Sequence, residues 1–421
     1  MPTQPRSHSD ALRVLHYCGR FSTLSETFIY DLVKGLDQQG IENHVVTHER
    51  LRPKSRPFPR VHVLKKSSPR SLECLARRVW MKASTGDASG ALWLTGRRHL
   101  RRIVQTVKPD LIHAHFGPLG AKIAPVSEKE GIPLVTTFHG YDATWYPRDH
   151  FWHGQLSQLC RTESASVGVS ENICNKVRLL GAPERSVVKI ANGVDLEQFP
   201  YQSPTSGFNG SQVEWLFVGR LVPKKGILYL LESFRRAKAR TPRSIQLKLH
   251  IIGDGPEKEA LIAARQQAGL QESVEVHGAK PHHFVREMMK RCHLLAQHSV
   301  TSSDGDQEGQ PVSLIEAAAS GLPIVSTRHS GIPEVVIEGK NGYLVDERDV
   351  ETMADRMAQL NSHPESWEAM SLYGRKHAEQ NLQLPTQLEA WKSLYFKLCN
   401  IATDPQQAPA LQPELVKSGS F

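Results

Sequence analysis

The sequence has no long apolar run and only six cysteines among its 421 residues. No stretch approaches the roughly 18 consecutive apolar residues that a membrane-spanning helix needs. Residues 1–18 lack the basic, apolar and small-residue order of a secretory signal. The cysteines form no C-x-x-C pair and have no histidine at zinc-binding spacing. We therefore expect a cytoplasmic protein with reduced thiols, no metal and no cofactor.

Positive charge is concentrated in one part of the chain. The net charge is +9, but residues 49–110 contain sixteen Lys or Arg and only four acidic residues, which gives +12 there. Such a patch favours an anionic partner, namely a membrane surface, a polyphosphate or nucleic acid, although a solvated Arg-rich surface has the same composition. No nucleic-acid recognition motif accompanies the charge, so we expect no nucleic acid.

Apolar side chains within the basic stretch provide possible membrane anchors. They are Leu75, Val79, Trp80, Met81, Leu92, Trp93, Leu94, Leu100 and Ile103. Trp beside Arg on a helical face is typical of a helix at a membrane interface. A helix that packs on the core and has a basic outer side would have the same pattern. The sequence therefore predicts a peripheral membrane contact as a hypothesis.

Short apolar runs alternate with helical patterns in two series, which end with GYLV at residues 342–345. This order predicts an α/β fold with parallel sheets. The polar segment 201–212 separates the two series. We expect two Rossmann-like domains, at 1–200 and 201–380, and a helix at 381–402 that crosses back to the first. Residues 403–421 are expected to be disordered. Ligands should bind beyond the carboxyl ends of the strands, between the domains.

One predicted helix is placed to bind an anion. Pro311 suits a first helical turn, and Val312–Ser320 forms a plausible helix that Gly321 ends. The backbone N–H groups of Val312, Ser313 and Leu314 would then face a ligand. Glu308 and Glu316 could each hold a sugar diol, one on the ribose and one on the transferred hexose. Two glutamates near a helix start can also simply complement the helix dipole.

Two further strings concern phosphate. Gly219, Arg220 and Lys225 follow a predicted strand and could bind a diphosphate, although a basic surface turn would look the same. Asp304 and Asp306 have the D-x-D spacing of a metal site. They lie in the loop TSSDGDQEG rather than directly after an apolar strand. We therefore favour cations over a metal as the groups that neutralise the phosphates.

Together these strings resemble the E-x7-E signature of retaining GT-B glycosyltransferases of family four. The matching segments are Glu308-Gly309-Gln310-Pro311 with Glu316, Gly219-Arg220 with Lys225-Gly226, Asn192-Gly193-Val194-Asp195 with Phe199, and Ser330-Gly331-Ile332-Pro333-Glu334 with Asn341-Gly342. The segments at residues 24–29 and 138–142 further resemble the exopolysaccharide branch, which includes colanic-acid-type transferases. The resemblance covers about residues 15–344.

The resemblance implies a role for each matching residue. The implied catalytic residues are His139, Arg220, Lys225 and Glu308. The implied donor-binding residues are Gly219, Gly278, Lys280, Gly309, Gln310, Pro311, Val312, Ser313, Leu314 and Glu316. The implied acceptor-side residues are Gly19, Arg20, Ser25, Glu26 and Asp142. The first loop departs from the family pattern because Gly19 stands there without a neighbouring glycine.

The resemblance also implies partners and leaves alternatives. It implies a nucleotide-sugar donor, a saccharide acceptor linked to a lipid diphosphate, and a role in exopolysaccharide synthesis at the membrane. An epimerase or a phosphorylase of the same fold is an alternative, although a phosphorylase would need a pyridoxal lysine and usually a longer chain. A non-catalytic membrane-binding module is another alternative. The presence of Arg220, Lys225, Glu308 and Glu316 argues against an inactive site.

Overall fold

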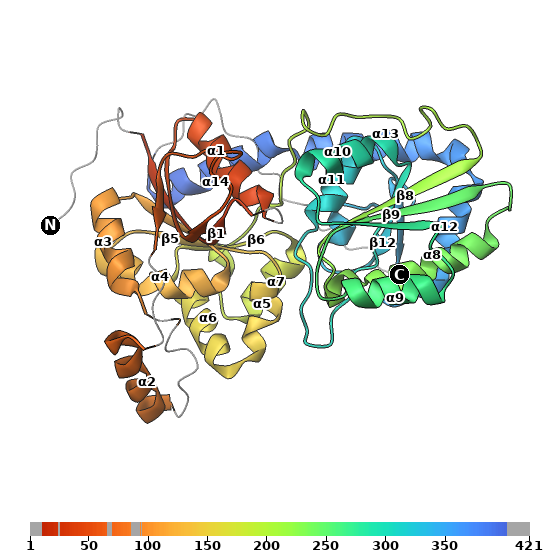
Figure 1. Cartoon of the computed structure of the whole chain (residues 1–421). Coiled ribbons are helices and arrows are strands. Elements are labelled where there is room, and N and C mark those ends of the chain that lie inside the picture. The colour runs from red at the N-terminus through yellow and green to blue at the C-terminus, as the bar shows by residue number, and fades with distance from the viewer. Residues whose placement is uncertain (1–10, 24–25, 65–69, 86–92, 94, 402–421) are drawn as a thin grey trace, which may run out of the picture.

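The computed structural model describes residues 11–23, 26–64, 70–85, 93 and 95–401. Two separate sheets divide this part of the chain into two α/β units (Figure 1). Within the described residues, no helix has both the length and the apolar character needed to cross a bilayer. The expected residues Leu24, Ser25, Leu92 and Leu94 and the tail 403–421 lie outside the described residues.

The first sheet has seven parallel strands in the order β3-β2-β1-β4-β5-β6-β7. They are β1 (Arg13–Phe21), β2 (Glu42–Arg50), β3 (Val61–Val63), β4 (Leu111–His115), β5 (Leu134–Phe138), β6 (Ala165–Gly168) and β7 (Val187–Lys189). The helices are α1 (Thr27–Gln38), α2 (Leu72–Thr85), α3 (Arg97–Val107), α4 (Gly117–Glu130), α5 (Tyr141–Thr144), α6 (His150–Thr162) and α7 (Glu171–Leu179). The central strands β4 and β5 are buried throughout, including the polar side chains His113, His115, Thr136 and Thr137.

The second sheet has six parallel strands in the order β10-β9-β8-β11-β12-β13. They are β8 (Gln212–Val218), β9 (Gln246–Ile252), β10 (Val274–Gly278), β11 (Leu294–Ala296), β12 (Ile324–Thr327) and β13 (Gly342–Val345). The later helices are α8 (Ile227–Arg240), α9 (Lys258–Gln267), α10 (His282–Arg291), α11 (Val312–Ser320), α12 (Val350–Ser362), α13 (Trp367–Asn381) and α14 (Leu384–Leu398). The predicted pair of Rossmann-like domains, the GT-B arrangement, is confirmed.

Each sheet is covered by helices on both faces. In the first domain, α3, α4, α6 and α7 pack on one face, and α1 with α14 packs on the other. In the second domain, α8, α9 and α12 cover one face, and α10, α11 and α13 cover the other. In both sheets the strand order changes direction beside the first strand, β1 or β8, and ligands of such sheets bind at that point.

The chain crosses between the domains at two adjacent places. Val194 exchanges two backbone hydrogen bonds with the returning chain, since its N–H donates to Leu382 and its carbonyl accepts from Leu384, both at 2.8 Å. Helix α14 then packs against α1, although it follows the second domain in sequence (Figure 1). A side chain at Gly35 would clash with Leu388, with a Cβ at 2.5 Å, so glycine permits this close helix contact.

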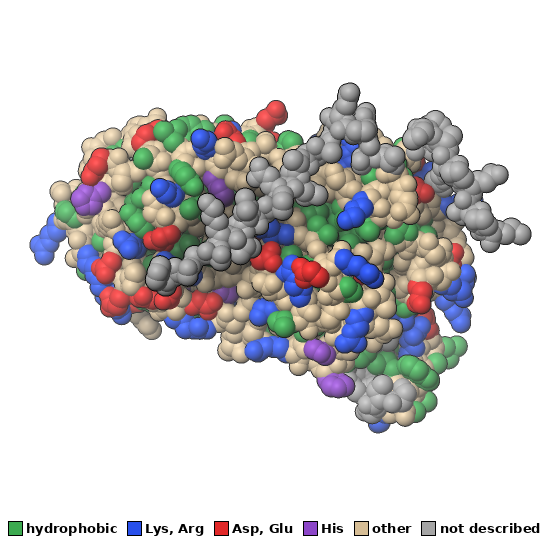
Figure 2. Space-filling view, turned by 180° about the vertical axis from the view of Figure 1, so that it is seen from behind, with side chains coloured by type: hydrophobic (Ala, Val, Ile, Leu, Met, Phe, Trp, Pro, Cys, Tyr) green, Lys and Arg blue, Asp and Glu red, His purple; other side chains and the backbone are tan. Residues whose placement is uncertain are grey.

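The basic stretch is only partly as expected. Leu72, Leu75, Val79 and Trp80 of α2 are exposed, Trp80 by 66%. Met81, Leu100 and Ile103 were expected as anchors but are buried in the core, and Trp93 is half-buried. Helix α3 is therefore a core helix with a basic outer side. Helix α2 protrudes from the domain at the lower left of Figure 1, and apolar side chains gather there at the lower right of Figure 2.

Candidate active site

A cleft of about 350 Å³ separates the two domains at the carboxyl ends of their strands. The first domain contributes loops and the start of α1, and the second contributes the loops after β8, β9 and β10 and the start of α11. Residues that line the cleft include Glu26, Phe28, Phe116, His139, Gly219, Arg220, Lys224, Lys225, Lys280, His282, Glu308, Gly309, Gln310, Pro311, Val312, Ser313 and Glu316. Most of the residues expected at the site therefore meet in one place.

Helix α11 points its first turn into the cleft. It runs from Val312 to Ser320 as predicted, and Gly321 ends it with φ 94°. Pro311 lies one position earlier than expected, at the N-cap. The expectation for Leu314 is wrong: its N–H donates to the Pro311 carbonyl at 3.1 Å, and its side chain is buried in the core. The start of the helix presents Val312 and Ser313 to the cleft instead.

Lys225 and Glu308 form a buried ion pair in the cleft, with Nζ 3.1 Å from Oε1. Burial lowers the pKa of Lys225, and the charge of Glu308 opposes this shift. Burial raises the pKa of Glu308, but the charges of Lys225 and Lys224 outweigh burial, so its pKa is lowered. Glu308 is therefore a carboxylate at neutral pH. Arg220 is exposed at the cleft and adds a further cation.

Hydrogen bonds to other parts of the chain fix the loop that contains Glu308. The Glu308 N–H donates to Nε2 of His329 at 3.0 Å, so the other ring nitrogen of His329 carries the proton and donates to Glu347. Glu347 also accepts from the Thr301 backbone N–H at 2.7 Å. The Gln310 side chain accepts from the Asn192 N–H at 2.8 Å, close to the connection between the domains. The position of Glu308 is therefore fixed by contacts beyond its own motif.

His139 lies opposite, on the wall formed by the first domain. Its ring lies between Phe28 and Phe116, with centroid distances of 4.7 and 4.6 Å. Neither ring nitrogen has a hydrogen-bond partner among the described residues, and burial lowers the pKa of His139 to about 3. Its carbonyl faces Gly309 so closely that a Cβ at Gly309 would lie 2.0 Å from it. A neutral imidazole thus stands where the two domains touch.

Asp142 does not line the cleft, so its expected acceptor-side position is wrong. Its carboxylate lies under the His139 loop and accepts from the N–H groups of Gly117, His139 and Gly140 at 2.9 to 3.0 Å. It is 1% exposed, and burial raises its pKa to about 6 although these hydrogen bonds oppose the shift. Asp142 therefore positions the loop of His139 rather than contacting an acceptor.

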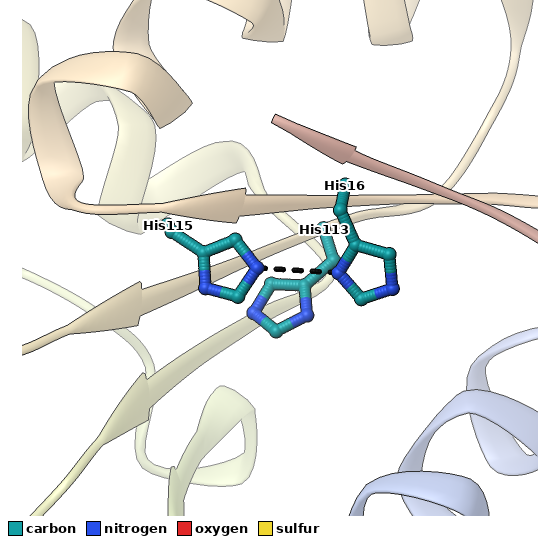
Figure 3. A group of neighbouring side chains, drawn as sticks. All are labelled: His16, His113 and His115. Carbon is teal, nitrogen blue, oxygen red and sulfur yellow. Dashed lines mark hydrogen bonds between the residues drawn. The ribbon is translucent and has the colours of Figure 1, made fainter. Parts of the chain in front are cut away.

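Three buried histidines lie behind His139 on the sheet (Figure 3). Nδ1 of His16 is 3.2 Å from Nε2 of His115, and the rings of His115 and His139 are stacked with centroids 6.3 Å apart. Burial lowers the pKa of His16 to about 4 and holds those of His113 and His115 well below their usual range. The environment behind His139 is therefore uncharged at neutral pH.

Glu316, in the second domain, has a hydrogen-bond partner that the sequence did not indicate. Glu316 Oε1 is 3.0 Å from His282 Nε2, at the start of α10. Lys280 lines the cleft as expected, but Gly278 does not, because its carbonyl accepts from the Gly253 N–H at 3.0 Å beneath the loop. Lys280 therefore lies in the cleft, where a donor-binding residue is expected, and Gly278 does not line it.

Of the remaining acceptor-side residues that the structure describes, Glu26 lines the cleft and two do not. Gly19 and Arg20 belong to strand β1, which continues to Phe21, rather than to a loop, and neither lines the cleft. Glu26 does line it. Burial raises the pKa of Glu26, while Arg20 and Arg220 lower it. Ser25 lies outside the described residues.

Asp304 and Asp306, the D-x-D pair, are engaged by Lys224 and by groups of their own loop. Asp306 pairs with Lys224 at 2.9 Å, and Asp304 accepts from the Ser302 hydroxyl and the Asp306 N–H. Neither aspartate is among the described residues that line the cleft. Lys224 lines it, and the sequence signal for Lys224 was its place beside Lys225 in the basic turn. His282, His329 and Glu347 had no such signal, because their partners are distant in sequence.

Comparisons with known proteins agree with this architecture. The model for Glycosyltransferase Family 4 matches residues 25–198, and that for Glycosyl transferases group 1 matches residues 199–377. WcaL of Salmonella typhimurium, named as a colanic acid biosynthesis glycosyltransferase, is 30% identical over 375 residues, which cover 83% of this chain and 91% of that protein. TuaC of Bacillus subtilis, named for teichuronic acid biosynthesis, is 31% identical over 288 residues, 64% of this chain and 67% of TuaC.

A solved structure has the same fold. HepE of Anabaena, in complex with UDP and glucose, superposes with a TM-score of 0.71 at 18% identity, and the match covers 92% of this chain and 100% of that chain. At this identity the likeness shows the arrangement of the two domains.

Proposed function

Since the chain belongs to glycosyltransferase family 4, we propose that it transfers a hexose from a nucleotide sugar to a saccharide with retention of anomeric configuration. The main support for this proposal is that one cleft lies between a positively charged surface of the second domain and an uncharged histidine of the first. Arg220, Lys225 and the start of α11 supply positive charge on one side. Neutral His139 stands on the other.

The donor groups divide among the residues of the second domain. Arg220 and Lys225 bind the diphosphate together with the N–H groups of Val312 and Ser313, which the helix dipole favours. Glu316, held by His282, accepts the ribose hydroxyls. Glu308 accepts hydroxyls of the hexose beside Lys225. Each carboxylate can accept two hydrogen bonds, which suits a diol.

The reaction separates charge across the cleft. As the bond from the anomeric carbon to the diphosphate breaks, negative charge grows on the phosphate and positive charge grows on the sugar. Preorganised cations at Arg220 and Lys225 stabilise the leaving group, so we propose that no metal ion is required. His139 presents a backbone carbonyl and a neutral ring, neither of which repels the positive sugar.

The acceptor is proposed to be a growing saccharide on a lipid diphosphate, at the cytoplasmic face of the membrane, in exopolysaccharide synthesis. The names of WcaL and TuaC support this role. Helix α2 exposes Leu72, Leu75, Val79 and Trp80, and Arg78 and Lys82 are exposed on the same helix. An anionic lipid surface fits this combination, because each cation near it adds about 1 kcal/mol.

Liposome flotation tests the membrane contact. The protein should float with anionic vesicles at low salt and be released at high salt, and the double variant Val79→Ala/Trp80→Ala should float far less. Leu372→Ala, at an exposed apolar position of α13, is the matched control. Equal flotation of wild type and double variant would remove α2 from the proposal.

Donor hydrolysis tests the transfer itself. The purified chain is incubated with UDP-, GDP- and ADP-hexoses, and release of the nucleotide is measured. We expect turnover with one base, and a loss of turnover in Arg220→Ala. Isomerisation of the donor without release of the nucleotide would indicate an epimerase instead.

A further inference from the structure

A group of metal-binding side chain types lies in the second domain, and none of its members lines the cleft. Glu214 is on β8, His250 is on β9, and Cys292 follows α10. The three are buried, with exposed fractions of 5%, 2% and 3%. One ligand atom from each lies within 4.8 Å of the other two. Carboxylate, imidazole and thiolate are all ligands that Zn²⁺ accepts in proteins.

His250 has a free nitrogen that faces the group. Its Nε2 is buried and has no hydrogen-bond partner among the described residues, and Glu214 Oε2 is 3.9 Å away. Its Nδ1 is 3.1 Å from Nε2 of His277, whose Nδ1 is 3.5 Å from Glu275. If His277 points its own N–H at Glu275, it accepts from Nδ1–H of His250. This leaves a lone pair on Nε2 of His250, as in histidines that bind metals.

The charges of the group suit a dication. Glu214 pairs with the Arg291 guanidinium at 2.9 Å, which favours its ionised form. Arg291 donates to both carboxylate oxygens at 2.9 Å, and Gln212 also donates to Oε1 at 2.7 Å, so Oε2, the oxygen nearer His250, is the one that keeps a second lone pair. The Cys292 thiol would lose its proton to solvent as the metal–sulfur bond forms. One carboxylate and one thiolate then oppose the two charges of the ion, and the Arg291 guanidinium, which pairs with Glu214, adds one positive charge beside them.

We propose that Glu214, His250 and Cys292 bind a single divalent transition metal ion of the Zn²⁺ type. In a tetrahedral site the ligand atoms are about 3.3 to 3.7 Å apart, given Zn–N near 2.0 Å and Zn–S near 2.3 Å. The distances within the group therefore need to shorten by at most about 1.1 to 1.5 Å. A neighbouring cavity of about 330 Å³, lined by His250, Glu275 and Arg291 among others, gives access and room for a water at the fourth position. The ion would tie β8 and β9 to the end of α10.

The buried histidines His16, His113 and His115 are the rival metal site (Figure 3). They offer three neutral ligands, so a bound dication would keep its full charge in the core, which is costly. Both nitrogens of His113 are already engaged at 2.6 Å, by Tyr395 and Thr137. The group around Cys292 has the better charge balance and a free nitrogen.

Cobalt titration of the full-length chain, first treated with a chelator, tests the proposal. Co²⁺ bound to a thiolate has an intense sulfur-to-cobalt charge-transfer absorption, which imidazole ligands alone do not give. We expect this band to saturate at one equivalent, and Zn²⁺ to remove it by displacement. Cys292→Ser should abolish the band, and Cys174→Ser, which changes another buried thiol, should leave it unchanged.

The contact of His277 with His250, outside the three proposed ligands, gives an independent check. His277→Gln should keep the band but weaken Co²⁺ binding about 10- to 100-fold, as loss of an orienting partner does. Circular dichroism establishes that each variant is folded, and Glu214→Gln replaces Cys292→Ser if the latter does not fold. The proposal is wrong if no charge-transfer band forms with the wild type, or if the band persists in Cys292→Ser. Cobalt binding without that band, lost in His16→Gln, would assign the metal to the histidine group instead.

Discussion

The two walls of the cleft differ in how they use charge. The wall of the second domain is charged: it holds Arg220 and the ion pair Lys225–Glu308, and Glu316 lies 3.0 Å from His282. In the wall of the first domain the His139 ring is uncharged and lies between two phenylalanines in front of buried, uncharged histidines, while the carboxylates of Glu26 and Asp142 lie in the cleft and beneath the His139 loop. The difference matches the proposed reaction, in which negative charge leaves toward one wall and positive charge remains beside the other.

The difference also shows how each wall is made. Lys225 and Glu308 of the second domain neutralise each other, so their burial costs less than that of two single charges. The histidines of the first domain are uncharged because burial lowers the pKa of each, and in His113 and His115 the neighbouring histidines lower it as well. The charged wall should therefore depend on individual side chains, and the neutral wall on pH.

Replacement of Lys225 should have the largest effect. Lys225→Ala removes a cation that faces the leaving phosphate, so we expect kcat to fall by about 10²- to 10³-fold. Steady-state kinetics with the active donor measures this change. Lys290→Ala, at an exposed lysine paired with Glu287, is the control and should keep full activity. A fall of less than about threefold in Lys225→Ala would remove the residue from the chemistry.

A double variant separates stability from catalysis at the same pair. Lys225→Ala alone leaves Glu308 buried without its partner and should lower the melting temperature. Lys225→Met with Glu308→Gln removes both charges and should recover most of that stability. Activity should remain absent. Recovery of activity in the double variant would show that the pair is only structural.

Glu316→Gln should have the next largest effect. The change removes a charged hydrogen-bond acceptor, and bonds to charged groups contribute about 1.5 to 3 kcal/mol. We expect the Kd of the nucleotide to rise by about 10- to 100-fold, with a smaller change in kcat. Calorimetry with the nucleotide alone measures it. An unchanged Kd together with a large loss of kcat would move Glu316 from binding to chemistry.

The neutral wall predicts that stability falls with acid. The pKa of His16 is about 4 in the folded state against 6.5 in its unperturbed form, so the unfolded state binds one more proton between these values. The free energy of unfolding therefore keeps its full value above pH 6.5. It falls as the pH decreases toward 4, by about 1.4 kcal/mol per pH unit for each such histidine. Denaturation from pH 7 to 5 measures the slope. His16→Gln should make the slope shallower, and an unchanged slope would mean that His16 is charged in the fold.

Loss of the hydrogen bond between the Glu308 N–H and His329 should have the smallest effect. His329→Ala removes the acceptor of the Glu308 N–H, and one such hydrogen bond contributes about 1 kcal/mol. We expect kcat/KM to fall about fivefold, and Glu347→Gln to have a smaller effect of the same kind. His363→Ala, an exposed histidine, is the control. A loss as large as that of Lys225→Ala would show that His329 itself contacts the substrate.

Much of the charged wall could be predicted because its residues lie close together in sequence. The bounds of α11 follow from Gly321 and the apolar run before it, and Glu308 and Glu316 follow from their place around that helix. Lys225 follows from the turn after β8. Such local patterns determine the residue type and the element, and they need no knowledge of distant contacts.

The errors occurred where distant contacts decide the position of a side chain. Asp142 and Leu314 belong to the expected segments, but backbone donors and core packing turn them away from the cleft. His282 and His329 were missed because each meets a glutamate from another element. The group around Cys292 has ligands from separate elements and no motif spacing, so only the fold brings it together.

One measurement tests the central claim about the two walls most directly. The hexose released from the active donor is observed by proton NMR as it forms, in the presence of EDTA. The account predicts that the sugar first released has the anomeric configuration of the donor and that EDTA does not slow its release. Release of the opposite anomer, or turnover that stops with EDTA and returns with Mg²⁺, would contradict it.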